Sequence, residues 1–337
     1  DYGTDGGSGG GAIKIDADGT VTLDGTVTAN GNGAGNGGGG SGGSVWIQAG
    51  TVAGSGTISA NGGAGTNQNG GGGGGRVAIY YTNGSVWSGV NAYGGSSTDT
   101  VDREDGGAGT IYIKQASAAN GDILVKGGNL NDANYTDQAT TASQTYDNIT
   151  VSNGAEYRIS SGYTLSLASG GSLTGGGSPQ PQLIVDSGTF VPTGYSTWSV
   201  SDLDVYNAGT IAVVTDLTVS GAQFTMNPDT GTFSAGLVDL TVENSGTFLL
   251  EGNSTFNVTN LTVGDGGTLT HEYNTTAESN SVVVTATSVD VQANGQIGVD
   301  GRGYEGREGP GAPASQGAGG YGGMGGDRSG DAGATYG

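Results

Sequence analysis

The sequence predicts an all-β protein, a parallel β-solenoid whose inter-rung loops are rich in polyglycine. Three observations favour this fold class. Short hydrophobic pairs alternate with polar residues, the pairs recur about every 32 residues, and glycine runs fall between the recurrences. Alternation with a period of two is typical of strands with one buried face, and a fixed longer period is typical of repeat architectures.

The first glycine-rich region contains four stretches that align with one another. They begin at Ile13, Val45, Val77 and Ile111, so successive starts are 32, 32 and 34 residues apart. Each opens with an alternating pair of β-branched residues, and Gly, Asn and Asp bound the short runs. Such pairs between turn formers predict short strands. The spacing predicts that these strands stack at equivalent positions.

The first unit indicates how one rung is built. Its opening pair is followed by two more, Val21 with Leu23 and Val27 with Ala29, and Asp-Gly turns separate the three pairs. Three short strands per repeat describe one rung of a parallel β-solenoid.

Corners are predicted where Asn recurs at the same point of a unit. Asn30 and Asn61 each stand between Ala and Gly. Asn tolerates the left-handed backbone conformation that a sharp corner requires. We therefore interpret these two residues as stacked corners rather than as ligands. Trp46 alternates with Val45 and Ile47, which places it on the outer face, under a glycine loop.

The glycine runs lie between the rungs, at 31–44, 62–76 and 94–110, in a chain with 74 Gly among 337 residues. Ordering a glycine costs more backbone entropy than ordering any other residue. Glycine segments without Cβ atoms can nevertheless approach closely enough for hydrogen bonding between backbones, as at the axis of collagen. We expect these segments to stack beside the rungs.

A different unit fills residues 129–281, an irregular β region. Its pattern is an alternating pair, a Gly-containing turn and a second pair, with the leucines of the first pairs 14, 23 and 21 residues apart. These leucines are Leu203, Leu217, Leu240 and Leu261. Shorter solenoid rungs explain the pattern, and hairpins of a β-sandwich remain the alternative.

Residues 282–337 form a third region, after residues 1–128 and 129–281. This region returns to the pattern of hydrophobic pairs seen in the first region. Its pairs are Val282 with Val284, Val289 with Val291, and Ile297 with Val299, and a long glycine tail follows. The chain starts in a glycine loop directly before a rung and stops in a loop after one. Placed after the tail, the start of the chain would complete the missing transition from loop to rung.

Exposed rungs at both ends predict head-to-tail self-assembly. Open strand edges template further pairing, and a head-to-tail contact that does not close gives an open filament. If the chain is instead part of a longer array, the same contacts are intramolecular. The predicted interface comprises Asp1, Tyr2, Ile13, Ile15, Ile297, Val299, Tyr304, Tyr321 and Tyr336.

Charge and composition bear on partners and location. The chain has nine Lys and Arg against 31 Asp and Glu, a net charge of −22, no Cys and no long apolar run. Nucleic acid and anionic membranes are disfavoured as partners, and no membrane span is expected. A first residue that is not Met favours a processed, exported protein, with an excised fragment as the alternative.

Catalysis is not expected. The single His271 follows a strand, and we expect it at the surface. Carbohydrate-active β-solenoids use paired carboxylates. The candidates for such a pair are Asp102, Glu104 and Asp105. A charge cluster of this kind is more often a solvated loop.

No cofactor is expected, although calcium has weak candidates. Asp16 and Asp18 resemble the start of an oxygen-ligand loop, but Val27 stands where the distal acidic residue belongs. Asp327 ends a segment similar to the front half of a calcium-binding nonapeptide, but Ser329 replaces its apolar residue.

Asn-x-Ser/Thr sequons concentrate in the middle region and are candidates for glycosylation of an outward face. The six candidates are Asn134, Asn148, Asn253, Asn257, Asn260 and Asn274, and a further sequon lies at Asn83.

The stretches GGSGGSVWIQAGTVAGSGTISANGG and GGGGGGRVAIYYTNG resemble glycine-rich repeat proteins of prokaryotic cell surfaces. That resemblance covers residues 1–128 and 282–337. It implies a parallel β-helix in an extracellular location and supplies no catalytic residue. The expected function is a structural filament subunit. The alternatives are an adhesin or carbohydrate-binding stalk, with Tyr195, Trp198 and Tyr206 on the ligand, and, third, a carbohydrate-active enzyme.

Overall fold

The structure, a computed structural model, is all-β, and its sheets are mostly parallel. This much of the sequence prediction is confirmed. The residues described are 6–66, 69–97, 105–130, 134–138, 143–192, 197–198, 202–206, 209–211, 216–221, 223–228, 230–233, 237–305, 308–310 and 312. Within these ranges no helix is long and apolar enough to cross a membrane.

The chain packs into two compact units. The first comprises Asp1–Val214 with Phe233–Ala235, and the second comprises Thr215–Thr232 with Gly236–Gly337. The strands of the first unit are β1 (Ala12–Thr22), β2 (Thr26–Thr28), β3 (Ser44–Ala53), β4 (Thr57–Ser59), β5 (Arg76–Gly84), β6 (Gly89–Asn91), β7 (Thr110–Gln115), β8 (Asp122–Lys126), β9 (Thr136–Asp137), β10 (Ser143–Ser152), β11 (Glu156–Ile159), β12 (Thr164–Gly176), β13 (Gln182–Asp186), β14 (Thr189–Pro192), β15 (Thr197–Trp198), β16 (Asp202–Tyr206) and β17 (Thr210–Ile211).

β20 (Thr232–Phe233) falls at the division between the units. The strands of the second unit are β18 (Asp216–Ser220), β19 (Gln223–Met226), β21 (Leu237–Glu243), β22 (Thr247–Leu250), β23 (Phe256–Val263), β24 (Thr268–His271), β25 (Val284–Thr285), β26 (Ser288–Val291) and β27 (Gln296–Ile297).

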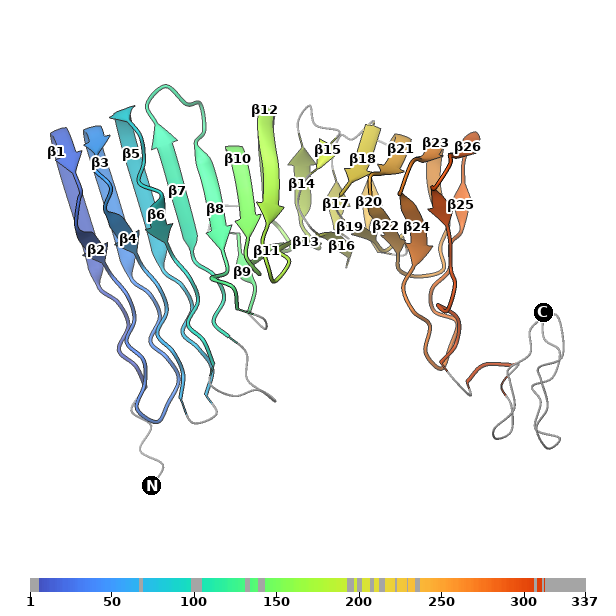
Figure 1. The fold of residues 1–337 in the computed structure, drawn as a ribbon, viewed down its shortest axis with the longest axis horizontal. Helices are drawn as coiled ribbons and strands as arrows, with labels where there is room; N and C mark the ends of the chain where they lie inside the picture. The colour runs from blue at the N-terminus through green and yellow to red at the C-terminus, as the bar shows by residue number, and fades with distance from the viewer. Residues whose placement is uncertain are drawn as a thin grey trace. The chain divides into compact units, whose positions relative to one another are not determined.

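In the first unit, residues separated by the predicted repeat spacing pair with one another in adjacent strands. β1, β3, β5 and β7 lie side by side and parallel (Figure 1), with Ile13 opposite Val45, Val45 opposite Val77, and Val77 opposite Ile111. A second sheet of β2, β4 and β6 stacks Val27, Ile58 and Val90 in the same way. The inward side chains of both sheets form one apolar core, which also holds the buried Trp87.

The glycine segments are ordered by hydrogen bonds between backbones. Gly39 and Gly42 donate to Gly70 and Gly73 of the next repeat. These donors are three residues apart, which is the period of a polyproline II helix. A Cβ on Gly42 would lie 2.1 Å from the carbonyl oxygen of Ala60, so the segments pack too closely for a side chain at such positions. The expected stacking of glycine segments is confirmed.

One expectation fails at the fourth unit. We expected the strands after Ile111 to continue the parallel rungs, but β8 runs antiparallel to β7. Only residues 116–121 connect these strands, whereas a parallel crossover needs about a dozen residues or more. The chain therefore turns back as a hairpin.

The hairpin moves the core to the other face of the sheet. Ile123 lies opposite Tyr112, and directly opposed residues in an antiparallel pair share a face. Ile123 is buried and pairs with the buried Ile149 of β10. The outward face of β7 thus continues into the interior face of β8, β10 and β12.

The rest of the first unit builds on that second face. β10, β12, β14 and β17 are parallel neighbours, and β9, β11, β13 and β16 form a second parallel set. Tyr157, Leu165 and Phe190 are fully buried here.

The second unit also consists of parallel ladders. β18, β21 and β23 stack Leu217, Leu240 and Leu261 in register. β19, β22, β24 and β27 form the other ladder, with Phe224 stacked on Phe248 at 5.1 Å between ring centroids. These pairings are parallel and therefore unlike the antiparallel pairing of a β-sandwich.

Candidate functional site

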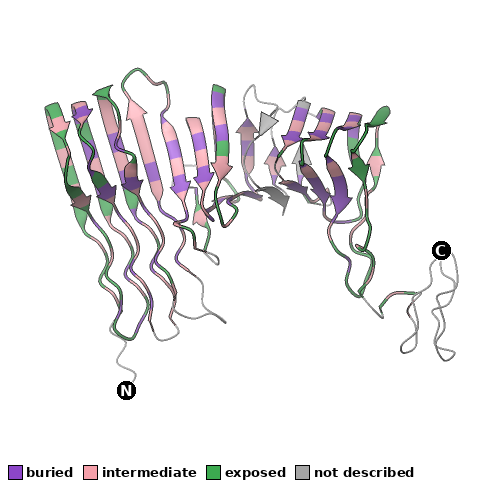
Figure 2. Ribbon diagram, viewed as in Figure 1, coloured by how far each residue is buried: buried purple, intermediate pink, exposed green. Residues whose placement is uncertain are grey.

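The first candidate surface is the N-terminal edge, formed by β1 and β2. Both strands have a partner on one side only within the described residues. Neither contains a buried residue, whereas four residues of β3 are buried. Figure 2 shows this as exposed and intermediate colours on β1 and β2. Ile13, Ile15 and Val27 pack against the core from one side and stay partly open.

A matching surface lies at the C-terminal edge, formed by β25, β26 and β27. None of these strands contains a buried residue, and each pairs on one side only within the described residues. Four large apolar side chains are 41–54% exposed here, namely Val289, Val291, Ile297 and Val299. Apolar side chains next to an open strand edge are typical of a surface that pairs with another chain.

The predicted corners form a ladder of side chain to backbone hydrogen bonds. The Asn30 Oδ1 accepts from the backbone N–H of Asn61 at 2.7 Å, and the Asn61 Oδ1 accepts from that of Tyr93 at 2.8 Å. Each corner therefore satisfies one donor of the following repeat. The structural role of these Asn residues is confirmed, but the predicted left-handed backbone is wrong, since neither Asn30 nor Asn61 has a positive φ and their side chains cap backbone N–H groups instead.

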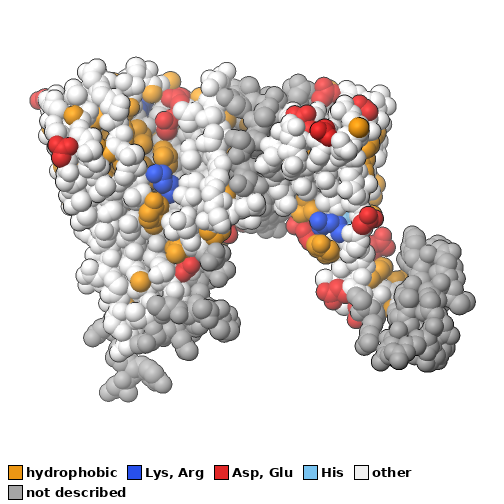
Figure 3. Space-filling view, viewed as in Figure 1, with side chains coloured by type: hydrophobic (Ala, Val, Ile, Leu, Met, Phe, Trp, Pro, Cys, Tyr) orange, Lys and Arg blue, Asp and Glu red, His pale blue; other side chains and the backbone are white. Residues whose placement is uncertain are grey.

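The second candidate surface is a row of aromatic rings on the outward face of β3, β5 and β7, which ends at Tyr146 on the interior face of β10. We define the aromatic row as Trp46, Tyr80, Tyr112 and Tyr146, whose successive ring centroids are 5.9, 5.7 and 6.1 Å apart. The ammonium group of Lys14 lies 4.5 Å from the centroid of Trp46. Trp46 thus lies on the outer face as predicted, against Lys14 and Tyr80. Figure 3 shows hydrophobic side chains over these strands.

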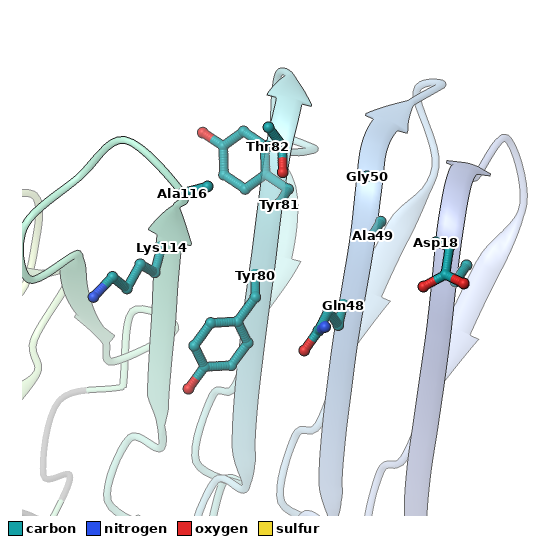
Figure 4. Close-up of a pocket in the computed structure, with 10 residues that line it drawn as sticks. Asp18, Gln48, Ala49, Gly50, Tyr80, Tyr81, Thr82, Lys114 and Ala116 are labelled. Atoms are coloured by element: carbon teal, nitrogen blue, oxygen red, sulfur yellow. The ribbon is translucent and has the colours of Figure 1, made fainter.

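Two hollows flank Tyr80. One, of about 330 Å³, is lined by Gln48, Tyr80, Lys114 and Asp18, and Figure 4 shows these side chains extending from adjacent strands. The other, of about 410 Å³, lies against Tyr112, Tyr146 and Arg76. Aromatic rings beside hydrogen-bonding groups suit ligands with apolar faces and polar edges.

Two phenols of the row, those of Tyr112 and Tyr146, stay neutral at physiological pH. Burial raises the pKa of Tyr146 to about 12 and also raises the pKa of Tyr112. The neighbouring Tyr157 is fully buried, which raises its pKa further. This face therefore offers aromatic rings, with Lys14, Arg76 and Lys114 supplying positive charge around them. The hydroxyl groups of Tyr112 and Tyr146 already donate to Asn120 and Gln144.

Two carboxylates of the first unit have structural partners. Asp137 accepts two hydrogen bonds from Arg158, at 2.8 and 3.1 Å, and bonding to Arg158 lowers the pKa of its carboxyl group. Asp147 accepts from the backbone of Gly121 and Asn120, which lowers its pKa. Both act as structural acceptors.

The calcium candidates do not form a cluster in the structure. Asp16 pairs with Lys14 at 3.2 Å, and Asp18 lines the hollow shown in Figure 4. Asp327 lies outside the described residues. Among the residues that the structure describes, no three His, Cys, Asp or Glu side chains gather as a metal site.

The candidate glycosylation residues differ in exposure. Asn257 and Asn253 are exposed, whereas Asn274 is buried and its Oδ1 accepts from the backbone of Ser279 and Asn280. Asn148 bonds Asp122 and Ser172, Asn260 bonds Asp239 and Ser288, and Asn134 is exposed in a loop.

The prediction of a surface histidine is wrong. His271 is 6% exposed at the end of β24, where it lies opposite Leu250, and Arg302 donates to its backbone oxygen at 2.8 Å. The inward position in the ladder buries it.

The candidate carboxylate pair is only partly described. Asp105 accepts a hydrogen bond from the backbone N–H of Ser97. Asp102 and Glu104 lie outside the described residues. The one carboxylate that can be placed therefore acts as a loop acceptor.

The predicted interface residues that the structure describes lie on or beside the two candidate edges. Ile13 and Ile15 belong to β1, Ile297 and Val299 to the C-terminal edge, and Tyr304 is partly buried just beyond it. Asp1, Tyr2, Tyr321 and Tyr336 lie outside the described residues, as does Tyr195. Trp198 and Tyr206 belong to β15 and β16, and their side chains are not described.

Sequence reasoning missed the aromatic row as a continuous feature. The outward positions of the aligned units hold Lys14, Trp46, Ala78 and Tyr112, so the alignment contained part of the signal. No protein-family model, curated protein or solved structure matches this chain.

Proposed function

We propose that this chain is a structural subunit of an extracellular filament or surface fibre, a parallel β-solenoid that assembles head to tail with copies of itself. The observation that carries the proposal is the state of the terminal strands. β1, β2, β25, β26 and β27 contain no buried residue and have one unpaired edge within the described part of the chain.

Open parallel edges are a liability that assembly removes. Each edge presents unpaired N–H and C=O groups, and pairing two such edges satisfies them. Stacking would also bury Val289, Val291 and Ile297, which are now exposed. Since the two edges differ, the contact is head to tail, and such contacts give filaments when the rotation does not close.

The solenoid aspect of the proposal rests on the registers. Ladders such as Leu217, Leu240 and Leu261 repeat one strand position in every turn of chain, which is the pattern of stacked rungs. The extracellular location rests on the resemblance to glycine-rich surface proteins.

Electron microscopy of the purified, untagged chain at neutral pH tests this function. We expect uniform fibres with one axial repeat. Isolated short rods at every concentration would overturn the proposal. Repeating the microscopy with a calcium chelator tests whether a metal joins the subunits. If it does, the fibres disappear.

A matched pair of variants tests whether the C-terminal edge forms the contact between copies. Val291→Lys puts a charge on the C-terminal edge, where Val291 is 47% exposed, and should abolish fibres. Val238→Lys puts the same charge on β21, where Val238 is 39% exposed, and should leave fibres intact. Equal effects of both changes would speak against the edge.

The aromatic row favours a second candidate, a carbohydrate-binding stalk. The apolar face of a sugar ring packs on aromatic rings, and its hydroxyl groups bond side chains such as Gln48 and Lys114 beside Tyr80. This candidate places the ligand on β3, β5 and β7 rather than on the middle region.

Sedimentation with insoluble cellulose, chitin and polygalacturonate gel tests the second candidate. We expect Tyr80→Ala to release the chain from whichever polymer binds it. The control is Tyr273→Ala, which removes a ring that is 58% exposed elsewhere. Absence of binding to all three polymers, or equal losses in both variants, counts against the aromatic row.

A further inference from the structure

The two terminal edges carry similar heptapeptides. Residues 25–31 read GTVTANG, residues 56–62 read GTISANG and residues 295–301 read GQIGVDG. In all three, an apolar residue at the third position belongs to a short strand, namely Val27 of β2, Ile58 of β4 and Ile297 of β27. The corner position is Asn in the first two and Asp300 in the last.

Hydrogen bonds fix the equivalence of these segments at their strand positions. In the second heptapeptide, the N–H groups of Thr57 and Asn61 donate to the preceding repeat. In the last, the N–H groups of Gln296 and Gly298 do the same, to Gly267 and Leu269. Donors toward the preceding repeat alternate along a strand, so Gln296 corresponds to Thr57 and Gly298 to Ser59. Asp300 takes the place of Asn61 by the alignment of the two heptapeptides, in a turn that the bond from the Arg302 N–H to the Val299 carbonyl closes.

One terminal edge supplies the donor of a corner hydrogen bond, and the other supplies the acceptor. Inside the first unit, a corner side chain accepts from the corner N–H of the following repeat. Within the described residues, the N–H of Asn30 has no such acceptor, since β2 is the first strand of its ladder. The exposed side chain of Asp300 offers a corner acceptor with no following repeat among the described residues.

We infer that residues 295–301 of one copy pair with residues 25–31 of the next, and that the carboxylate of Asp300 accepts from the backbone N–H of Asn30. This inference rests on the proposed function and names its joint. Ile297 then packs on Val27, and the N–H groups of Val299 and Gly301 donate to the carbonyls of Thr28 and Asn30. The same donor pattern occurs between the first two repeats, where Ala29 and Gly31 donate to Ser59 and Asn61.

Side-chain chemistry makes Asp300 testable. A hydrogen bond to a charged acceptor is about twice as strong as a neutral one. Asp300→Ala should therefore raise the critical concentration for fibres about ten-fold. Asp300→Asn keeps an oxygen like that of Asn30 and loses only the charge, so its critical concentration should lie between those of wild type and Asp300→Ala. Asp290→Ala is the matched control, since Asp290 is another exposed acid on the same edge.

Cross-linking tests the register independently of affinity. The chain has no Cys, so mixed fibres of Val27→Cys and Ile297→Cys variants form the heterologous disulfide only where these two positions meet between copies. We expect cross-linked dimers from this mixture and none from Val27→Cys with Val299→Cys, which is displaced by two residues.

The outcomes distinguish failure of the proposed joint from failure of the proposed filament function. Fibres that cross-link only in the displaced mixture, or that form equally well with Asp300→Ala, overturn the joint and leave the filament standing. If the wild-type chain forms no fibres, the proposed function itself fails. A selective effect of Asp300→Ala together with the Val27 to Ile297 cross-link establishes the joint.

Discussion

At the scale of single residues, the carboxylate of Asp147 holds the β7–β8 hairpin against β10. It accepts hydrogen bonds from the backbone N–H groups of Asn120 and Gly121 and from the Asn120 amide, at 2.9–3.0 Å. These are turn groups that the sheet ladder leaves unpaired. One side chain thus fixes the point at which the chain reverses and the core changes face.

We predict that Asp147→Ala lowers the free energy of unfolding at neutral pH by about 1 kcal/mol, the net value of such bonds at a partly exposed site. The pKa of Asp147 is lowered in the folded chain, so its stabilising effect is complete above the unfolded value, about 4, and disappears as pH falls through the folded value. Thermal melts of wild type and variant should differ at pH 7, and the difference should shrink as the pH falls below about 4. A constant difference would show that the charge is irrelevant.

Residue-level predictions from sequence succeeded where the period decided them. Ile13, Val45 and Val77 stack as expected because a strand in a repeat has only two faces. His271 was misplaced because its type suggested the surface, whereas its ladder position opposite Leu250 determines burial. Position in the repeat outweighed residue type.

At the scale of elements, the glycine segments act as an additional packed layer of the first unit. Positions without room for a side chain include Gly40 and Gly42, where an added Cβ would lie 2.2 and 2.1 Å from a backbone oxygen. Positions with room include Gly38 and the exposed Ser41, which are three residues apart. Because positions with room for a side chain recur every three residues, the glycine segments pack in one specific register.

We predict opposite effects for two alanines four residues apart. Gly42→Ala forces the backbone of Ala60 to move and should cost about 1–3 kcal/mol, as overpacking does. Gly38→Ala has its nearest neighbour at 3.6 Å and should be neutral or stabilise by about 0.5 kcal/mol, because alanine restricts the unfolded chain. Chemical denaturation of both variants measures this. Equal destabilisation would mean that the segments are not packed in this register.

The sequence predicted the positions of the strands better than their connections. The three strands predicted for the first repeat are two, because β1 runs from Ala12 to Thr22 through the predicted turn at Asp18 and Gly19. The start of β7 at the spacing of 34 residues is as expected, but the reversal into β8 is not. The overlooked signal was the connection of residues 116–121, which is too short for a crossover. The aromatic row was missed for the same reason, since the hairpin carries its outward face onto Tyr146.

At the scale of the whole molecule, charge opposes assembly. Each copy carries a net charge of −22, so copies repel one another. The C-terminal edge that the proposal joins to the next copy exposes apolar side chains, among them Val289, Val291 and Ile297. Long-range repulsion and short-range apolar contact respond differently to salt.

We therefore predict that fibres form faster as sodium chloride increases from about 0.02 M to about 0.5 M, since the Debye length falls from about 20 Å to a few ångströms. Light scattering at fixed protein concentration measures the rate. A decrease with salt would indicate that opposite charges, rather than apolar contacts, hold the copies together.

Protection of backbone amides along the chain gives the last prediction. In a stack, each strand depends on its neighbours, so the strands at the ends are the least protected. In the dilute, unassembled chain we expect fast hydrogen exchange in β1, β2, β26 and β27 and slow exchange in β3, β5 and β22, which contain fully buried residues. After assembly, the terminal strands should become as protected as the interior ones, while β3 and β22 change little. Because exchange reads each segment separately, protection that rises in β5 and β7 instead would move the contact to the aromatic row, and no change at either end would exclude pairing of the edges.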